Sequence, residues 1–230
     1  MKVLTKLILS VACAISLVLV LLTTALFLPS LSASFYMKQY VQNGVFERTG
    51  LGEAELLPIT RNIINYLRGT SDDLNVINGE RFDLFDQREV DHMVDVREQF
   101  IFAANVRKVS FLMFAVTFFI LTSHKKLKDT VLLLRLIRAV CGIVFILFGT
   151  FALFITLNFE LAFDLFHVLM YSNDYWILNP NVHLLINLLP GMFFVNISVV
   201  IAVLFAVFLA VSFTAANLLL HLYKRGCCAK

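Results

Sequence analysis

Four long stretches of this chain contain no Asp, Glu, Lys, Arg or His, and they constrain its fold more than any other feature. They are Leu7–Leu28, Val109–Ser123, Ala139–Phe159 and Leu184–Leu220. A helix needs about 20 mostly apolar residues to cross the hydrocarbon core of a bilayer. The composition, with 60% hydrophobic and 15% charged residues, is also far from that of a water-soluble domain. We therefore expect an all-α integral membrane protein.

Four transmembrane helices are the simplest division of these stretches. The second stretch is short, and it spans the bilayer only if basic side chains at its two ends extend outward into water. The fourth stretch is too long for one span, and Pro190–Gly191 divides it. The expected transmembrane helices are residues 1–28, 107–123, 139–159 and 192–222. The expected connections are an extracellular cap at 29–106, a cytoplasmic loop at 124–138, a second extracellular, aromatic loop at 160–191 and a cytoplasmic tail at 223–230.

The basic residues predict the orientation of the chain. Three short segments contain Lys2, Lys6, Lys125, Lys126, Lys128, Arg135, Arg138, Lys224, Arg225 and Lys230. A single acid, Asp129, accompanies them, whereas residues 160–191 contain three acids and no Lys or Arg. By the positive-inside rule, both termini and the 124–138 loop face the cytoplasm. The net charge of +3 reflects this topology and does not indicate nucleic-acid binding.

The first outer connection is too long to be a simple linker. Within it, Leu57–Arg68 has the period of a helix with one apolar face, made of Ile59, Ile63, Ile64 and Leu67. Gly69–Asp73 has the composition of a turn. A second helix is expected to begin near Gln87 and to continue into the second span.

The second outer connection is rich in aromatic residues. It contains Phe163, Phe166, Tyr171, Tyr175 and the single tryptophan, Trp176. Aromatic rings favour the depth of the lipid headgroups, so an amphipathic segment at that level is one interpretation. A simple aromatic belt that anchors the adjacent spans is the other.

Two histidines of the outer connections each have a carboxylate three residues away. His92 precedes Asp95, and His167 follows Asp164. On a helix, residues at this spacing share a face and their side chains can meet. A carboxylate that holds one imidazole nitrogen leaves the other nitrogen basic. The pattern predicts two such histidines at the same membrane boundary.

Two other interpretations of these histidines remain open from spacing alone. They could be surface residues in incidental ion pairs. They could also belong to a zinc or iron site, since imidazole and carboxylate suit both metals; its ligands would be Asp91, His92, Asp95, His167 and His183. No metal-binding motif such as His-Glu-x-x-His supports that site. We therefore predict no metal.

The two histidine motifs together resemble those of the bacterial lipoprotein intramolecular transacylase family. They read Glu89-x-x-His92-Met93-x-Asp95-Val96, then Phe163-Asp164-x-Phe166-His167, with Trp176 downstream. The likeness extends to the number of spans, the large first outer loop and the aromatic second one. It implies an enzyme at the outer leaflet of the bacterial cell membrane, where the sn-2 acyl chain of a diacylglyceryl lipoprotein moves to the α-amine of its N-terminal cysteine. The product is a lyso-form lipoprotein, and no cofactor is required.

The resemblance also implies roles for residues. The catalytic pair would be His92 and His167, and we expect His167 to act as the base and His92 on the oxyanion side. Asp95 and Asp164 would orient them. Glu89 would bind the substrate ammonium or cap its helix. Trp176, Phe163 and Phe166 would line a pocket for acyl chains and exclude water.

Two further functions compete with the transacylase. A non-enzymatic assembly or accessory protein of the membrane would have the same spans and an outer cap. A histidine-dependent lipid hydrolase would use the same residues on water. A transporter is disfavoured, because such proteins place ionisable residues inside their spans. The expected partners are the lipoprotein substrate and membrane lipid.

Overall fold

The computed structural model describes residues 2–77, 79–123 and 127–228. The chain forms two compact units. We call the first, made of Met1–Ala25, Ala104–Phe154 and Ala202–Lys230, the span unit. The second is made of Leu26–Ala103 and Ile155–Ile201, and we call it the site unit.

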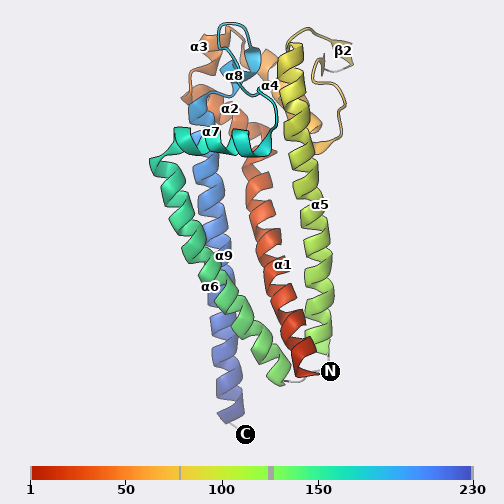
Figure 1. Ribbon diagram of the computed structural model, residues 1–230, viewed down its shortest axis with the longest axis vertical. Coiled ribbons are helices and arrows are strands. Elements are labelled where there is room, and N and C mark those ends of the chain that lie inside the picture. Colours follow the sequence, from red (N-terminus) through yellow and green to blue (C-terminus); the bar gives the residue numbers. More distant parts are fainter. Residues whose placement is uncertain (1, 78, 124–126, 229–230) are drawn as a thin grey trace. The chain divides into compact units, whose positions relative to one another are not determined.

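Four helices are long and apolar enough to cross a membrane, as expected (Figure 1). They are α1 (Val3–Ser30), α5 (Gln87–Ser123), α6 (Leu127–Leu157) and α9 (Gly191–Cys228). Apart from one small hairpin, all regular structure in the described residues is helical. The prediction of an all-α protein with four membrane-spanning helices is confirmed.

Helical structure extends beyond the expected transmembrane bounds. Residues 124–126 of the expected 124–138 loop lie outside the described residues, and the rest of that loop belongs to α6. Similarly, α9 continues through residues 223–228 of the expected tail. Lys, Arg and Leu are good helix formers, so the helices continue where the sequence ceases to be apolar.

Within the span unit, polar contacts join helices that are distant in sequence. The Lys6 ammonium of α1 lies 2.6 Å from a carboxylate oxygen of Asp129 in α6. Arg138 of α6 donates to the amide oxygen of Asn217 in α9 at 3.2 Å. The one acid among the basic segments therefore has a basic partner, which removes the cost of an unpaired buried carboxylate.

The site unit contains short helices and a hairpin. These are α2 (Ala33–Gln42), α3 (Val45–Thr49), α4 (Glu53–Arg68), β1 (Val76–Ile77), β2 (Glu80–Arg81), α7 (Phe159–Met170) and α8 (Leu184–Leu188). The two strands pair antiparallel, Val76 with Arg81 and Ile77 with Glu80. Two predicted helices are present: α4 covers the expected Leu57–Arg68, and α5 begins at Gln87.

The core of the site unit forms around α4. Its predicted apolar face is buried, as Ile59, Ile63, Ile64 and Leu67 are each at most 5% exposed. They pack in one cluster with residues of α2, α8 and α9, including Tyr40, Leu188 and Phe193. The helix ends at Gly69, whose φ of 75° is the left-handed conformation that glycine adopts without strain.

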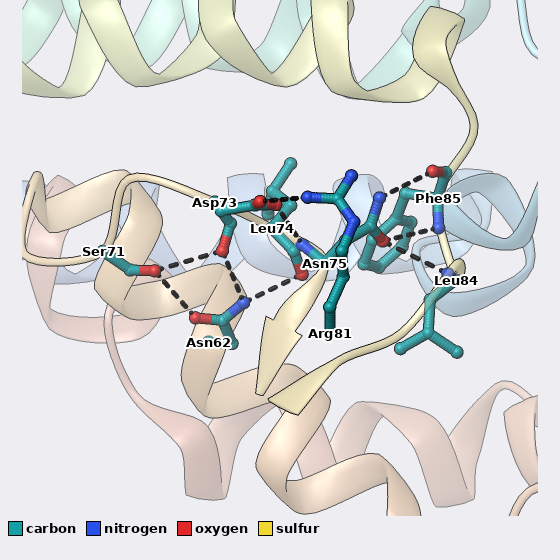
Figure 2. Close-up of polar contacts among 8 residues, drawn as sticks. All are labelled: Asn62, Ser71, Asp73, Leu74, Asn75, Arg81, Leu84 and Phe85. Atoms are coloured by element: carbon teal, nitrogen blue, oxygen red, sulfur yellow. Dashed lines mark hydrogen bonds and ion pairs between the residues drawn. The ribbon is translucent and has the colours of Figure 1, made fainter. Parts of the chain in front are cut away.

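Two buried asparagines connect α4 to the start of α5 (Figure 2). The Asn62 amide donates to the backbone carbonyls of Asp73 and Leu74 at 3.1 and 2.8 Å. The Asn75 side chain accepts from the backbone N–H of Phe85 and donates to its carbonyl, both at 2.9 Å. Because buried backbone groups must be paired, these amides hold the irregular segment that leads into α5.

Candidate functional site

A cavity of about 390 Å³ lies within the site unit, and apolar side chains form most of its wall. His92 and Gln99 line it from α5, and His167 lines it from α7. The segment after α7 contributes Tyr171 and Trp176. The two predicted histidines therefore face the same apolar space, although they are distant in sequence.

The imidazole rings of His92 and His167 lie close to each other. Their centroids are 6.0 Å apart and their planes are inclined by 37°. Each ring is carried by a different helix, so the packing of α7 against α5 sets their separation. A single small reacting group between the rings could contact both, as acid–base catalysis by two residues requires.

The surroundings of His167 select its tautomer. Its Nδ1 lies 2.7 Å from the backbone carbonyl oxygen of Phe163. A carbonyl oxygen only accepts hydrogen bonds, so Nδ1 carries the proton and Nε2 keeps a free lone pair. Burial lowers the pKa of His167 and outweighs the Phe163 hydrogen bond and the Asp164 charge, which raise it. His167 is thus a neutral imidazole whose Nε2 can accept a proton.

Three aromatic side chains enclose His167. The Trp176 ring stacks on it at 4.6 Å with an angle of 27°. Phe163 lies 4.2 Å away, and Phe166 meets it edge-on at 5.3 Å. All three side chains also line the cavity.

His92 has a different environment. It is half-buried, and its Nδ1 is enclosed without a hydrogen-bond partner among the residues that the structure describes. The ring of Tyr171 meets it edge-on at 5.5 Å. Enclosed polar atoms are normally paired, so this nitrogen is an exception among the buried groups of the site unit.

The two aspartates lie near the histidines but do not bond to them in the described contacts. The Asp95 carboxylate accepts from the Asn173 amide at 2.8 Å. Asp164 is exposed. Among the described contacts, neither carboxylate accepts a hydrogen bond from His92 or His167. For His167, the Phe163 carbonyl occupies the orienting position for which Asp164 was expected.

Glu89 is almost completely buried, at 1% exposure, and both its carboxylate oxygens accept backbone hydrogen bonds. One oxygen accepts from the N–H of Leu185 in α8 at 2.6 Å, and the other accepts from the N–H of Asp86 at 2.9 Å. Asp86 accepts in return from the Glu89 N–H at 2.9 Å, which completes a capping box at the start of α5. Of the two roles expected for Glu89, these contacts favour capping.

Arg88 holds the Trp176 segment, a role that the sequence analysis missed. It donates to the backbone carbonyls of Asp174 and Ile177, and it pairs with the Asp174 carboxylate at 3.2 Å. Together with the Asp95–Asn173 bond, these contacts attach residues 173–177 to α5. The sequence did contain an indication of this role. Residues 160–191 are acidic and have no Lys or Arg, so a basic partner must come from another segment.

Gln99 and Tyr171 were also missed as site residues. The Gln99 side chain lies near the Tyr171 hydroxyl, and both side chains line the cavity. The available signal was spacing, because Gln99 lies seven residues after His92 and so shares its face of α5.

The metal interpretation finds no support in the described part of the chain, where no three His, Cys, Asp or Glu side chains are grouped to hold an ion. His183, one of the ligands considered, has other partners. Its Nδ1 accepts from the Asn179 N–H at 2.7 Å, and its Nε2 lies 3.1 Å from Asp86. It therefore supports the capped start of α5.

Comparison with known proteins identifies one family. The sequence profile of a family described as lipoprotein intramolecular transacylase Lit matches residues 11–194. No curated protein sequence matches the chain.

Solved structures share the fold. The structure of the membrane integral lipoprotein intramolecular transacylase Lit from Bacillus cereus has a TM-score of 0.83 and 20% identity, over 97% of this chain and 99% of that one. A variant of that protein with one histidine changed to arginine has a TM-score of 0.75 and 18% identity, over 98% of this chain and 95% of that one. A variant with a histidine changed to alanine has a TM-score of 0.74 and 19% identity, over 96% of both chains.

Proposed function

This chain belongs to the lipoprotein intramolecular transacylase family, and we propose that it transfers the sn-2 acyl chain of a diacylglyceryl lipoprotein to the α-amine of the lipoprotein's own N-terminal cysteine. The product is an N-acylated lyso-form lipoprotein. One observation carries the proposal: His92 and His167 face one apolar cavity with their rings 6.0 Å apart. The substrate lipoprotein is the partner, and the bilayer supplies its surroundings.

The reaction joins two groups of one molecule. The nitrogen of the amine forms a bond to the carbonyl carbon of the ester, and the π electrons of the carbonyl move onto its oxygen. When this tetrahedral intermediate collapses, the bond to the glycerol oxygen breaks. The main task of the enzyme is to hold amine and ester together, because intramolecular reactions gain most from proximity.

His167 is proposed as the base. Its Nε2 lone pair takes the proton that the amine loses and returns it to the departing glycerol oxygen. The Phe163 carbonyl supports this role, since it keeps the other proton on Nδ1. His92 is proposed to donate to the carbonyl oxygen as that oxygen becomes negative.

The remaining site residues are proposed to support this pair. Trp176, Phe163 and Phe166 would surround the acyl chain and keep water from the ester, which it would otherwise hydrolyse. Asp95 would act by holding Asn173, and Asp164 by its charge near His167. Glu89 would keep the start of α5, and hence His92, in place.

The proposed location is the bacterial cell membrane, with the site at the outer leaflet and both termini in the cytoplasm. The four apolar helices make the protein multi-pass. The distribution of basic residues supports the sidedness. The proposed extracellular cap, residues 29–106, would include the helices between α1 and α5 and the first part of α5.

Mass spectrometry of a lipoprotein's N-terminal peptide tests the proposal. Wild type, His92→Ala and His167→Ala would be expressed in a bacterium whose lipoproteins stop at the diacylglyceryl stage. We expect wild type to move one chain from an ester to an amide at unchanged total mass, and both variants to lose at least about 100-fold of this activity. Exposed His221, changed to Ala, is the matched control and should retain activity.

The same spectra separate the competing functions. Loss of the mass of one acyl chain would identify a hydrolase. No change with well-expressed wild type would contradict the proposal and favour an accessory role. Membrane insertion of each variant would be checked by fractionation, so that loss of protein is distinguished from loss of activity.

A further inference from the structure

Tyr171 completes a triangle with the two histidines. Its ring centroid lies 5.5 Å from that of His92 and 5.7 Å from that of His167. It is the first residue after α7, and its N–H donates to the His167 carbonyl at 2.9 Å. The position of Tyr171 therefore follows directly from that of His167.

The ring of Tyr171 is held on several sides. It meets His92 at 84° and Phe166 at 87°, both edge-on, and only 8% of the residue is exposed. A ring with such contacts has little freedom to rotate, so its hydroxyl occupies a defined place in the cavity.

Gln99 acts on the hydroxyl itself. Its nearby amide lowers the pKa of Tyr171, as a polar group close to the phenol oxygen does. Burial has the opposite and larger effect, and the Asp95 charge adds a smaller one in the same direction as burial. Together they raise the pKa of Tyr171 to about 12. The phenol is thus protonated at neutral pH.

We propose that the Tyr171 hydroxyl is a further catalytic group, which donates a hydrogen bond to the carbonyl oxygen of the acyl chain as that oxygen becomes an oxyanion. Gln99 is its positioning residue. The inference rests on the proposed transacylation and adds a second donor beside His92. Tyr171 keeps its proton throughout, while the proton of the amine passes through His167 to the glycerol oxygen.

The physical reason for a second donor is the charge that develops in the intermediate. A donor fixed in advance stabilises this charge without reorganisation, and an apolar wall strengthens the interaction. Tyr171 satisfies both conditions, because packing holds its ring and the cavity around it is mostly apolar.

Replacement of the hydroxyl alone tests the inference. Tyr171→Phe keeps the ring and its contacts with both histidines. Steady-state kinetics on a synthetic diacylglyceryl lipopeptide, with purified protein in lipid nanodiscs, should show kcat reduced about 100-fold. KM should change less than about threefold, because the lost bond strengthens only in the transition state. A kcat within threefold of wild type would overturn the inference.

A matched tyrosine controls for the loss of a hydroxyl. Tyr175→Phe removes one from the same segment and keeps the ring that lies under Arg88, and it should retain wild-type kcat. An inactive wild type would instead overturn the proposed function, so the two failures are distinguishable.

Gln99→Leu provides a second variant that leaves Tyr171 in place. It should reduce kcat about tenfold with KM nearly unchanged, and it should cause no further loss when combined with Tyr171→Phe. If the two losses multiply, Gln99 does not act through Tyr171, and that assignment is wrong. Should Tyr171→Phe fail to fold, an unchanged kcat in Gln99→Leu would overturn the inference by itself.

Discussion

At the scale of single residues, the contacts of His167 determine what it can do. A backbone carbonyl fixes its proton on Nδ1, and aromatic rings exclude water from its faces. Both effects favour a neutral imidazole with a free Nε2. The carbonyl is part of the same helix, four residues earlier, so this orientation does not depend on an acidic partner.

The single tryptophan of the chain reports on His167. Protonation of the imidazole should quench the emission of the stacked Trp176 indole, because a positively charged imidazole then lies against the face of the indole. Burial lowers the pKa of His167. We therefore expect the emission to decrease as the pH is lowered, with the midpoint of this transition below about pH 6.5. His167→Asn should remove this transition, whereas His221→Ala should leave it unchanged. A midpoint at or above 6.5 would contradict the assigned environment.

At the scale of the elements, Glu89 joins two helix starts. Its carboxylate accepts from α8 with one oxygen and from the first turn of α5 with the other. Asp86 extends the connection, since it lies 3.1 Å from His183, immediately before α8. The His92 turn and the α8 turn are thus held by one small network around the buried Glu89.

Loss of the Glu89 carboxylate should destabilise the protein. Glu89→Ala leaves two backbone N–H groups unpaired, one of them buried at Leu185, at a cost of about 2–3 kcal/mol. For a chain of this length we expect the Tm to fall by roughly 5–10 °C, measured by thermal shift in detergent. Glu89→Gln keeps only one acceptor oxygen, so its Tm should lie between those of wild type and Glu89→Ala. Exposed Glu98, changed to Ala, is the control and should keep the wild-type Tm.

At the scale of the whole molecule, the bilayer is the solvent that selects the architecture. Four helices satisfy their own backbone hydrogen bonds and present apolar side chains, which is the requirement for crossing hydrocarbon. The basic residues divide the remaining segments into two groups. Which group faces the cytoplasm follows from their charge and can be measured directly.

Cysteine labelling in intact cells tests the orientation. In a background with the four native cysteines replaced, Glu80→Cys in the hairpin should react with a membrane-impermeant maleimide from outside. Lys128→Cys, also an exposed position, should react only after the membrane is permeabilised. The charge bias supplies the reason, because basic segments are retained in the cytoplasm. The reverse labelling pattern would show that the orientation is wrong.

The sequence by itself determined the class of fold and the existence of the principal helices. Runs without charge must be buried in lipid or in a core, and the 3.6-residue period of residues 57–68 permits only a helix with one apolar face. It also indicated His92, His167 and Trp176 as candidates, through local motifs that resemble those of one family.

Only the tertiary structure decided which partners these residues have. Helical spacing suggested Asp164 for His167, whereas the described contact is the carbonyl of Phe163. Glu89 binds Leu185, and Asp95 binds Asn173, across long separations in the chain. Spacing reports only neighbours on one helix. Contacts between distant segments depend on how the helices pack, because packing brings unpaired buried groups together and each must then find a partner.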